Sequence, residues 1–170
     1  MVPYDRNMEI LGDYLILRPI EARDAAAIAA GLNDPDAARF LPSIPSPYTD
    51  ADAQAWVERC AQVWRDGTSY PFAIVDAGTD ELLGSIELHG EKATVGYWIV
   101  AGARGRGVAT QALRLLCGWA SERPLRLTTH PDNVASQRVA EKAGFQRIGT
   151  TTDHLVFRDG TREATLFELA

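Results

Sequence analysis

The sequence has few cysteines, few histidines and almost no lysine. Its two cysteines, Cys60 and Cys117, both fall in segments with a helical pattern. Two lone thiols do not make a disulfide framework, which indicates a reducing compartment. The three histidines, His89, His130 and His154, show no ligand spacing among themselves or with the cysteines, so we expect no metal site.

Two further absences narrow the class of protein. The first residues contain no apolar signal core, and no apolar run is long enough to span a bilayer. We therefore expect a cytoplasmic protein with no membrane partner. An excess of basic charge is also missing, because 17 lysines and arginines stand against 23 acidic residues, for a net charge of −6. Nucleic-acid binding needs a basic face, so we expect no nucleic-acid partner.

The remaining composition is that of an ordinary globular protein, with 46% hydrophobic and 24% charged residues. Because 170 residues contain no repeat and no linker between domains, we predict one domain over residues 1–170, with its core at about 14–169. Strand and helix patterns alternate, which favours an α/β fold with a mixed sheet. The predicted strands cover about 14–18, 70–75, 83–89, 94–100, 125–129 and 145–149, and the predicted helices about 25–32, 49–64, 109–120 and 133–143.

Local signals bound several of these elements. Asp24 is a candidate N-cap for the first helix, and Thr49 with Asp52 resembles a capping box for the second. Gly144 suits the left-handed residue after the helix at 133–143. Four prolines between 35 and 47 predict a linking region. The segments 154–158 and 165–169 predict a hairpin that turns near Asp159 and Gly160.

The most informative stretch is a glycine-rich turn, Arg104-Gly105-Arg106-Gly107-Val108-Ala109-Thr110, between a predicted strand and a predicted helix. The N–H groups of such a turn converge on an anion, and the helix dipole favours negative charge there. Glycine at 105 and 107 lets the backbone bend sharply and approach a ligand. The turn therefore predicts a site for a phosphorylated ligand, to which Arg104 and Arg106 can add local positive charge.

Two nucleotide-binding templates fit this turn poorly. The glycines at 102 and 107 have the spacing of a P-loop, but Val108 and Ala109 replace the lysine and the serine or threonine that it needs. The stretch from Gly105 also begins like a dinucleotide fingerprint. Thr110 stands there at the third glycine, and the acidic residue expected after a second strand is missing.

A third template, Gln/Arg-x-x-Gly-x-Gly/Ala, fits the turn from Arg104 to Ala109. Four other stretches accompany it in order: Leu15-Ile16-Leu17-Arg18-Pro19, Gly96-Tyr97-Trp98-Ile99, His130-Pro131-Asp132-Asn133-Val134-Ala135-Ser136 and Glu141-Lys142-Ala143-Gly144-Phe145. With them the chain resembles the GNAT family of acetyl-CoA-dependent N-acetyltransferases, in particular the RimJ/RimL-like branch that acetylates ribosomal-protein N-termini. The resemblance implies a single-domain GNAT fold, a mixed, splayed sheet flanked by helices.

The resemblance also implies an acetyl-CoA site without a metal ion. The pantetheine arm would pair with main-chain groups of Trp98, Ile99 and Val100 where the sheet splays. Asn133 would contact the arm, although it is equally suited to cap a helix. Ser136 would lie near the sulfur and protonate the departing thiolate. The pyrophosphate would lie on the turn, formed by Arg104, Gly105, Arg106, Gly107, Val108, Ala109 and Thr110.

The general base and the acceptor stay open at this point. Many members of the family carry a glutamate where this chain has Thr94, which cannot act as a base. Glu87 on the preceding strand is a candidate, with a solvated strand face as the alternative interpretation. Asp153, His154 and water are the others.

The acceptor is expected to be a primary amine, on a protein N-terminus or a small molecule. The loss of the usual glutamate keeps a non-catalytic CoA-binding sensor as an alternative. The preferred acyl group and the oligomeric state, a homodimer included, are not determined by the sequence. The aromatic residues Trp56, Trp64, Tyr97 and Trp98 are predicted to be core residues more than lining of an acceptor pocket. Neither cysteine stands in a nucleophile context, so a covalent acyl-enzyme is not expected.

Overall fold

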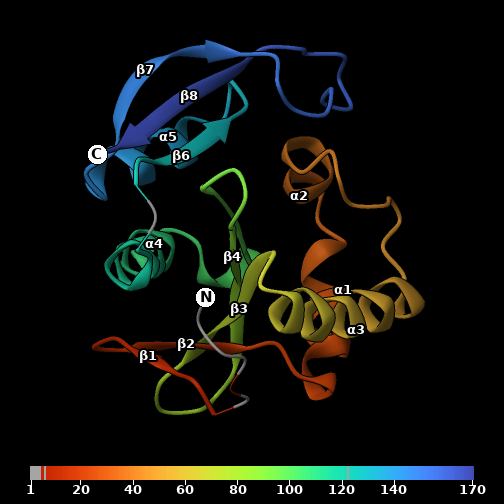
Figure 1. Cartoon of the computed structure of the whole chain (residues 1–170). Coiled ribbons are helices and arrows are strands. Elements are labelled where there is room, and N and C mark those ends of the chain that lie inside the picture. The colour runs from red at the N-terminus through yellow and green to blue at the C-terminus, as the bar shows by residue number, and fades with distance from the viewer. Residues whose placement is uncertain (1–4, 6, 122) are drawn as a thin grey trace.

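Eight strands form one mixed sheet in the order β1-β2-β3-β4-β5-β6-β8-β7 (Figure 1). The computed structural model describes residue 5 and residues 7–121 and 123–170. All neighbouring strands are antiparallel except β5 and β6, which are parallel. The strands are β1 (Ile10–Leu11), β2 (Leu15–Pro19), β3 (Ser69–Asp76), β4 (Leu82–His89), β5 (Thr94–Ile99), β6 (Leu125–Thr129), β7 (Gln146–Thr151) and β8 (Ala164–Leu169).

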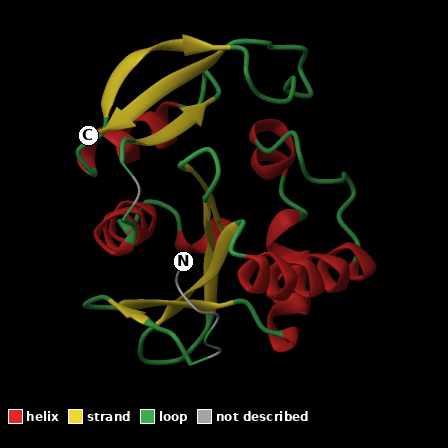
Figure 2. Cartoon of the chain, in the orientation of Figure 1, coloured by secondary structure: helices red, strands yellow, loops and turns green. Residues whose placement is uncertain are grey.

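Helices cover both faces of the central strands (Figure 2). Ile28 and Leu32 of α1 and Cys60 of α3 belong to one buried apolar cluster, whereas Leu113 and Leu116 of α4 belong to another. No helix in the described residues is both long enough and apolar enough to cross a bilayer. The helices are α1 (Ala25–Leu32), α2 (Pro35–Phe40), α3 (Asp50–Asp66), α4 (Val108–Trp119) and α5 (Val134–Lys142), with short 3₁₀ turns η1 (Ala22–Asp24) and η2 (Ala101–Ala103).

The sheet opens between β5 and β6. These two strands share one register pair, Thr94 with Arg126, and then diverge. Beyond the pair, β6 continues toward α5, and β8 and β7 complete the second half of the sheet (Figure 1). The expected splay of a mixed α/β sheet is therefore confirmed, and it leaves backbone groups of β5 without a strand partner.

The predicted helix ends agree with the structure in most places. Thr49 and Asp52 form a reciprocal capping box at the start of α3. Gly144 follows α5 with a φ of +96°, which satisfies the end of that helix with a conformation that suits glycine. The Asn133 side chain accepts a hydrogen bond from the Ser136 N–H at 3.1 Å and so caps α5.

Two sequence predictions are wrong. The region from 33 to 48 contains a helix, α2, because Asp34 accepts from the Ala37 N–H and Pro35 occupies the first turn, where its missing N–H costs nothing. The hairpin between 154–158 and 165–169 does not form. Instead β8 pairs with β6 and β7, and the Gly160 N–H donates to the Phe157 oxygen within the connecting loop.

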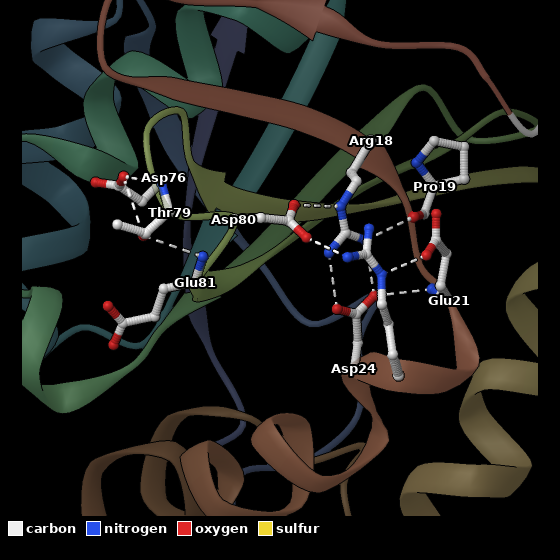
Figure 3. A network of polar contacts seen from close by, with 9 residues as sticks. Arg18, Pro19, Glu21, Asp24, Asp76, Thr79, Asp80 and Glu81 are labelled. Carbon is white, nitrogen blue, oxygen red and sulfur yellow. Dashed lines mark hydrogen bonds and ion pairs between the residues drawn. The ribbon is translucent and has the colours of Figure 1, made fainter.

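The role of Asp24 also differs from the prediction. It precedes α1, but its side chain makes no capping bond to that helix and accepts from the Glu21 N–H at the start of η1 at 2.8 Å. Its two carboxylate oxygens also accept hydrogen bonds from Arg18 Nη1 and Nη2, at 2.8 and 2.9 Å (Figure 3). Arg18 Nε also donates to Asp80 at 3.0 Å, and Arg23 pairs with Glu21 and Asp80. Because Arg18 is buried, this network joins β2, η1 and the turn before β4.

Candidate functional site

A cavity of about 470 Å³ lies between the open end of β5, the turn before α4, and helices α2 and α5. It gathers most of the residues that the sequence singles out. Val100, Arg106 and Glu87 are the predicted site residues that do not line it. The predicted residues that do line it are Trp98, Ile99, Arg104, Gly105, Gly107, Val108, Ala109, Thr110, Asn133 and Ser136.

The turn before α4 presents a row of unpaired donors to this cavity. Gly105 and Gly107 have φ values of +74° and +78°, which turn successive amides in one direction. None of the six N–H groups from 105 to 110 donates to a group in the described part of the chain, and the first bond of α4 comes from Gln111 to the Gly107 oxygen. With the positive end of the α4 dipole behind them, these amides form an anion cradle.

The two arginines of the turn have different surroundings. Arg104 Nη2 pairs with Asp34, Nη1 lies 3.4 Å from Asp36, and Nε donates to the Ile99 oxygen at 3.2 Å. Its charge is thus directed to α2 and β5. The Arg106 guanidinium has no hydrogen bond or ion pair with any described residue. The hydrogen bond from the Gly78 N–H lowers the pKa of Asp76, and the charge of Arg106 contributes to the same shift. Arg106 itself does not line the cavity.

Strand register decides which main-chain groups face the opening. The Val100 N–H donates to the Leu83 oxygen at 2.9 Å, so Val100 is hydrogen bonded to the β4 side. Trp98 lies two residues earlier, opposite Ser85, and has the same orientation. A Cβ on Gly84 would overlap the Trp98 oxygen, which agrees with this direction. The main-chain groups of Tyr97 and Ile99 therefore face the opening, in place of those expected from Trp98 and Val100.

A pair of hydroxyl groups lies deeper in the cavity. The Tyr97 hydroxyl is 2.7 Å from Ser136 Oγ. Burial raises the pKa of Tyr97 to about 12, so the phenol stays protonated at neutral pH. Asn133 uses its oxygen to cap α5, while its amide nitrogen donates to no described group and lines the same cavity. Both sequence interpretations of Asn133, cap and cavity residue, are thus compatible with its position.

The comparison with known families decides what this arrangement belongs to. The model of the acetyltransferase (GNAT) domain matches residues 14–146. The chain belongs to the GNAT family. Among curated proteins of Bacillus subtilis, the N-acetyltransferase YoaA, itself uncharacterized, is 25% identical over 158 residues, 88% of either chain. YjcK, described as a probable N-acetyltransferase, is 32% identical over an alignment of 90 residues, and the match covers 47% of this chain and half of that relative.

Solved structures agree on the GNAT fold. The ribosomal L7/L12 α-N-protein acetyltransferase RimL in complex with coenzyme A has a TM-score of 0.83 at 18% identity, covering 95% of this chain and 97% of that one. RimJ of Mycobacterium smegmatis in complex with a CoA disulfide has a TM-score of 0.78 at 22% identity, covering 91% and 81%. The ribosomal-protein-S5-alanine acetyltransferase of Vibrio fischeri has a TM-score of 0.81 at 17% identity, covering 95% and 96%. At these identities the neighbours show the fold alone.

In this GNAT chain the candidate bases lie outside the cavity. Glu87 is 17% exposed and approaches His89 Nδ1 at 3.4 Å. Glu87 pairs with Gly96 across β4 and β5, and side-chain alternation places it on the same face of the sheet as Trp98. The space above Gly96 is open, because a Cβ added to Gly96 would meet nothing within 4 Å. Tyr97 and Ser136 lie toward the other face, so the structure does not bring Glu87 and Ser136 together. Asp153 is exposed, and His154 Nδ1 donates to the Leu155 oxygen at 2.6 Å.

The third histidine has a structural role. His130 is buried, and its Nδ1 accepts from the Asp132 N–H at 3.0 Å across the turn at Pro131. Its Nε2 lies 2.8 Å from an Asp159 carboxylate oxygen, which fixes the loop before β8. These two contacts hold the turn at Pro131 against the loop before β8.

The cysteines and two of the tryptophans of this GNAT chain are core residues. Burial raises the pKa of the Cys117 thiol to about 11 and that of Cys60 further, so neither is a thiolate at neutral pH. Trp64 is buried against Tyr70 and Phe72, and Trp56 packs on the α1 and α3 cluster. Among the described residues, no group of three or more histidine, cysteine or acidic side chains could hold a metal ion.

Tyr97 lines the cavity, where the sequence favoured a core position over a pocket lining. The ring does pack against the core, but the hydroxyl end reaches the cavity. The sequence could have indicated this position, because every second residue of β5 has the same orientation in the sheet. Tyr97 shares this orientation with Ile99, whose backbone faces the opening.

Proposed function

We propose that this GNAT protein transfers the acetyl group of acetyl-CoA to a primary amine, on a protein N-terminus or a small molecule, within one domain that spans residues 1–170. The observation that carries the proposal is the row of unpaired N–H groups at 105–110, five of whose residues (105 and 107–110) line the same cavity as the open end of β5 and Ser136. A diphosphate suits such a cradle because several amides and a helix dipole act on one anion. Arg106, which has no hydrogen bond or ion pair with a described residue, can add positive charge near this turn.

The opening between β5 and β6 fits an extended amide-containing arm. The Ile99 N–H and the main-chain groups of Tyr97 face it without a strand partner. When bound, acetyl-CoA supplies an activated thioester for amine attack. The Ile99 N–H is then the donor we assign to negative charge that develops on the acetyl oxygen. Ser136 is the group we assign to protonating the departing sulfur.

For deprotonation of the amine we retain Glu87, acting through water. Its side chain is largely buried, and the open space above Gly96 separates it from Trp98, which lines the cavity. Trp98 and Glu87 are diagonal neighbours on the adjacent strands β5 and β4. One or two water molecules can bridge the distance between two side chains in such positions. His154 and Asp153 have no such continuity with the cavity.

Calorimetry with acetyl-CoA tests the donor, and thiol release tests the reaction. We expect binding in the presence of a chelator, and thiol release in the presence of peptides with a free α-amine or of small amines. Peptides with a blocked α-amine and no lysine are the matched controls. No acetyl-CoA binding at high protein concentration would overturn the donor assignment. Tight binding without thiol release across a broad amine panel would instead favour a CoA-binding sensor.

Replacing Glu87 with glutamine should lower kcat by at least about 100-fold, the lower end of what a positioned general base contributes to proton transfer. The acetyl-CoA dissociation constant should not change, since Glu87 does not line the cavity. The acidic limb of the pH–rate profile should also disappear. His89→Gln is the control, because His89 is the exposed neighbour of Glu87 on the same face. An unchanged pH–rate profile in the Glu87 variant would eliminate Glu87 as the base.

A further inference from the structure

A second hydroxyl lies directly behind Ser136. The Tyr97 hydroxyl is 2.7 Å from Ser136 Oγ and 3.4 Å from the Ser136 main-chain oxygen. Both residues line the cavity, Tyr97 from β5 and Ser136 from the first turn of α5. No other group in the described residues forms a hydrogen bond with either hydroxyl. The two hydroxyls are therefore an isolated pair that opens on the cavity.

We propose that Tyr97 is a positioning residue for Ser136, which orients the serine hydroxyl toward the cavity and resupplies its proton. This inference rests on the proposed acetyl transfer and assigns a residue to it that the family comparison does not. Tyr97 acts through Ser136 and not on the substrate itself.

The direction of the hydrogen bond follows from the acidity of the two groups. A phenol is a much stronger acid than an aliphatic alcohol, so the Tyr97 O–H is the better donor and Ser136 Oγ the acceptor. The serine proton is then free to point into the cavity. Burial keeps the phenol neutral and available as a donor, because it raises the pKa of Tyr97 to about 12. The bond from the Ser136 N–H to Asn133 fixes the turn that carries the serine.

The proton transfers balance without an added reactant. As the carbon–sulfur bond breaks, its electron pair goes to sulfur, and the Ser136 proton moves to sulfur. The Tyr97 proton moves to Ser136 Oγ, and the phenolate takes up a proton from water. The attacking amine has released one proton to water, so the sum is one proton passed from amine to thiol.

Tyr97→Phe removes the hydroxyl and keeps the ring that packs on the core. We expect kcat to fall about tenfold, the scale of one hydrogen bond in a transition state, with the acetyl-CoA dissociation constant unchanged. Adding Tyr97→Phe to Ser136→Ala should cost nothing further, because the tyrosine acts through the serine. Tyr70→Phe is the matched control, since Tyr70 is a buried tyrosine of β3 that does not line the cavity.

A readout independent of turnover is the pKa of the thiol of bound CoA, titrated by thiolate absorbance. Donated hydrogen bonds favour the thiolate, so Tyr97→Phe should raise this pKa by about half a unit and Ser136→Ala by at least as much. Wild-type kcat and wild-type thiol pKa in a folded Tyr97→Phe protein would overturn the relay. So would single-variant losses that multiply in the double variant. If the wild type binds no CoA, the proposed acetyl transfer itself fails, which is a separate result.

Discussion

Replacing Gly107 with valine should weaken acetyl-CoA binding by at least about 100-fold, the equivalent of roughly 3 kcal/mol. Gly107 has a φ of +78°, where a β-branched residue is strained. A Cβ there would also lie 3.2 Å from the Tyr14 hydroxyl, which donates to the Arg106 oxygen at 3.4 Å. The turn would have to change shape, and a change of shape redirects the amides of the anion cradle. Calorimetric titration with acetyl-CoA measures the loss.

A graded series separates backbone conformation from side-chain bulk. Gly107→Asn should bind better than Gly107→Val, because asparagine tolerates the left-handed conformation. Gly102→Ala is the control, since a Cβ there meets nothing within 4 Å and its φ is not positive. It should bind acetyl-CoA as the wild type does. Retained affinity in a folded Gly107→Val protein would remove the turn from the binding site.

Local signals carried most of what the sequence predicted correctly. The capping box at Thr49, the end of α5 at Gly144 and the turn before α4 all depend on a few consecutive residues, whose preferences act wherever the chain folds. The GNAT resemblance added the splay between β5 and β6, which no local pattern encodes. The same resemblance assigned the arm of the donor to the main-chain groups of Trp98, Ile99 and Val100, but the Val100 N–H is bonded to β4 and Trp98 has the same orientation.

The failures involve residues whose partners lie far along the chain. The four prolines between 35 and 47 predict a linking region, but only Pro35 lies in α2, at the first turn where the cap at Asp34 supports the helix. The false hairpin at 154–158 arose because its two segments look like neighbours, whereas β8 finds its partners in β6 and β7. Asp24 lies before α1, but its carboxylate pairs with Arg18 of β2, which also donates to Asp80 in the turn before β4. Pairing of this kind is decided by tertiary structure and outweighs local preference.

Replacing Arg18 with methionine should lower the free energy of unfolding by about 3–5 kcal/mol, because it leaves a buried carboxylate without its partner. Arg18 is only 5% exposed, as is Asp24. The loss should appear as an earlier urea midpoint with an unchanged slope. Arg23→Gln is the matched control. Its side chain is 57% exposed, and a pair of that exposure contributes less than about 1 kcal/mol.

Whether the unpaired Asp24 carboxylate causes this loss of stability can be tested by removing its charge. Asp24→Asn in the Arg18→Met background should restore part of the stability, because the amide oxygen can still accept from the Glu21 N–H, as the carboxylate does at 2.8 Å. The pH dependence gives a second test. The hydrogen bond from Arg18 lowers the pKa of Asp80 in the folded protein, so its stabilisation is present above the unfolded pKa and is lost as the pH falls through the folded value. The Arg18→Met variant should therefore lose less stability on acidification than the wild type. An equally steep acid limb in both proteins would show that Arg18 does not stabilise the ionised Asp80.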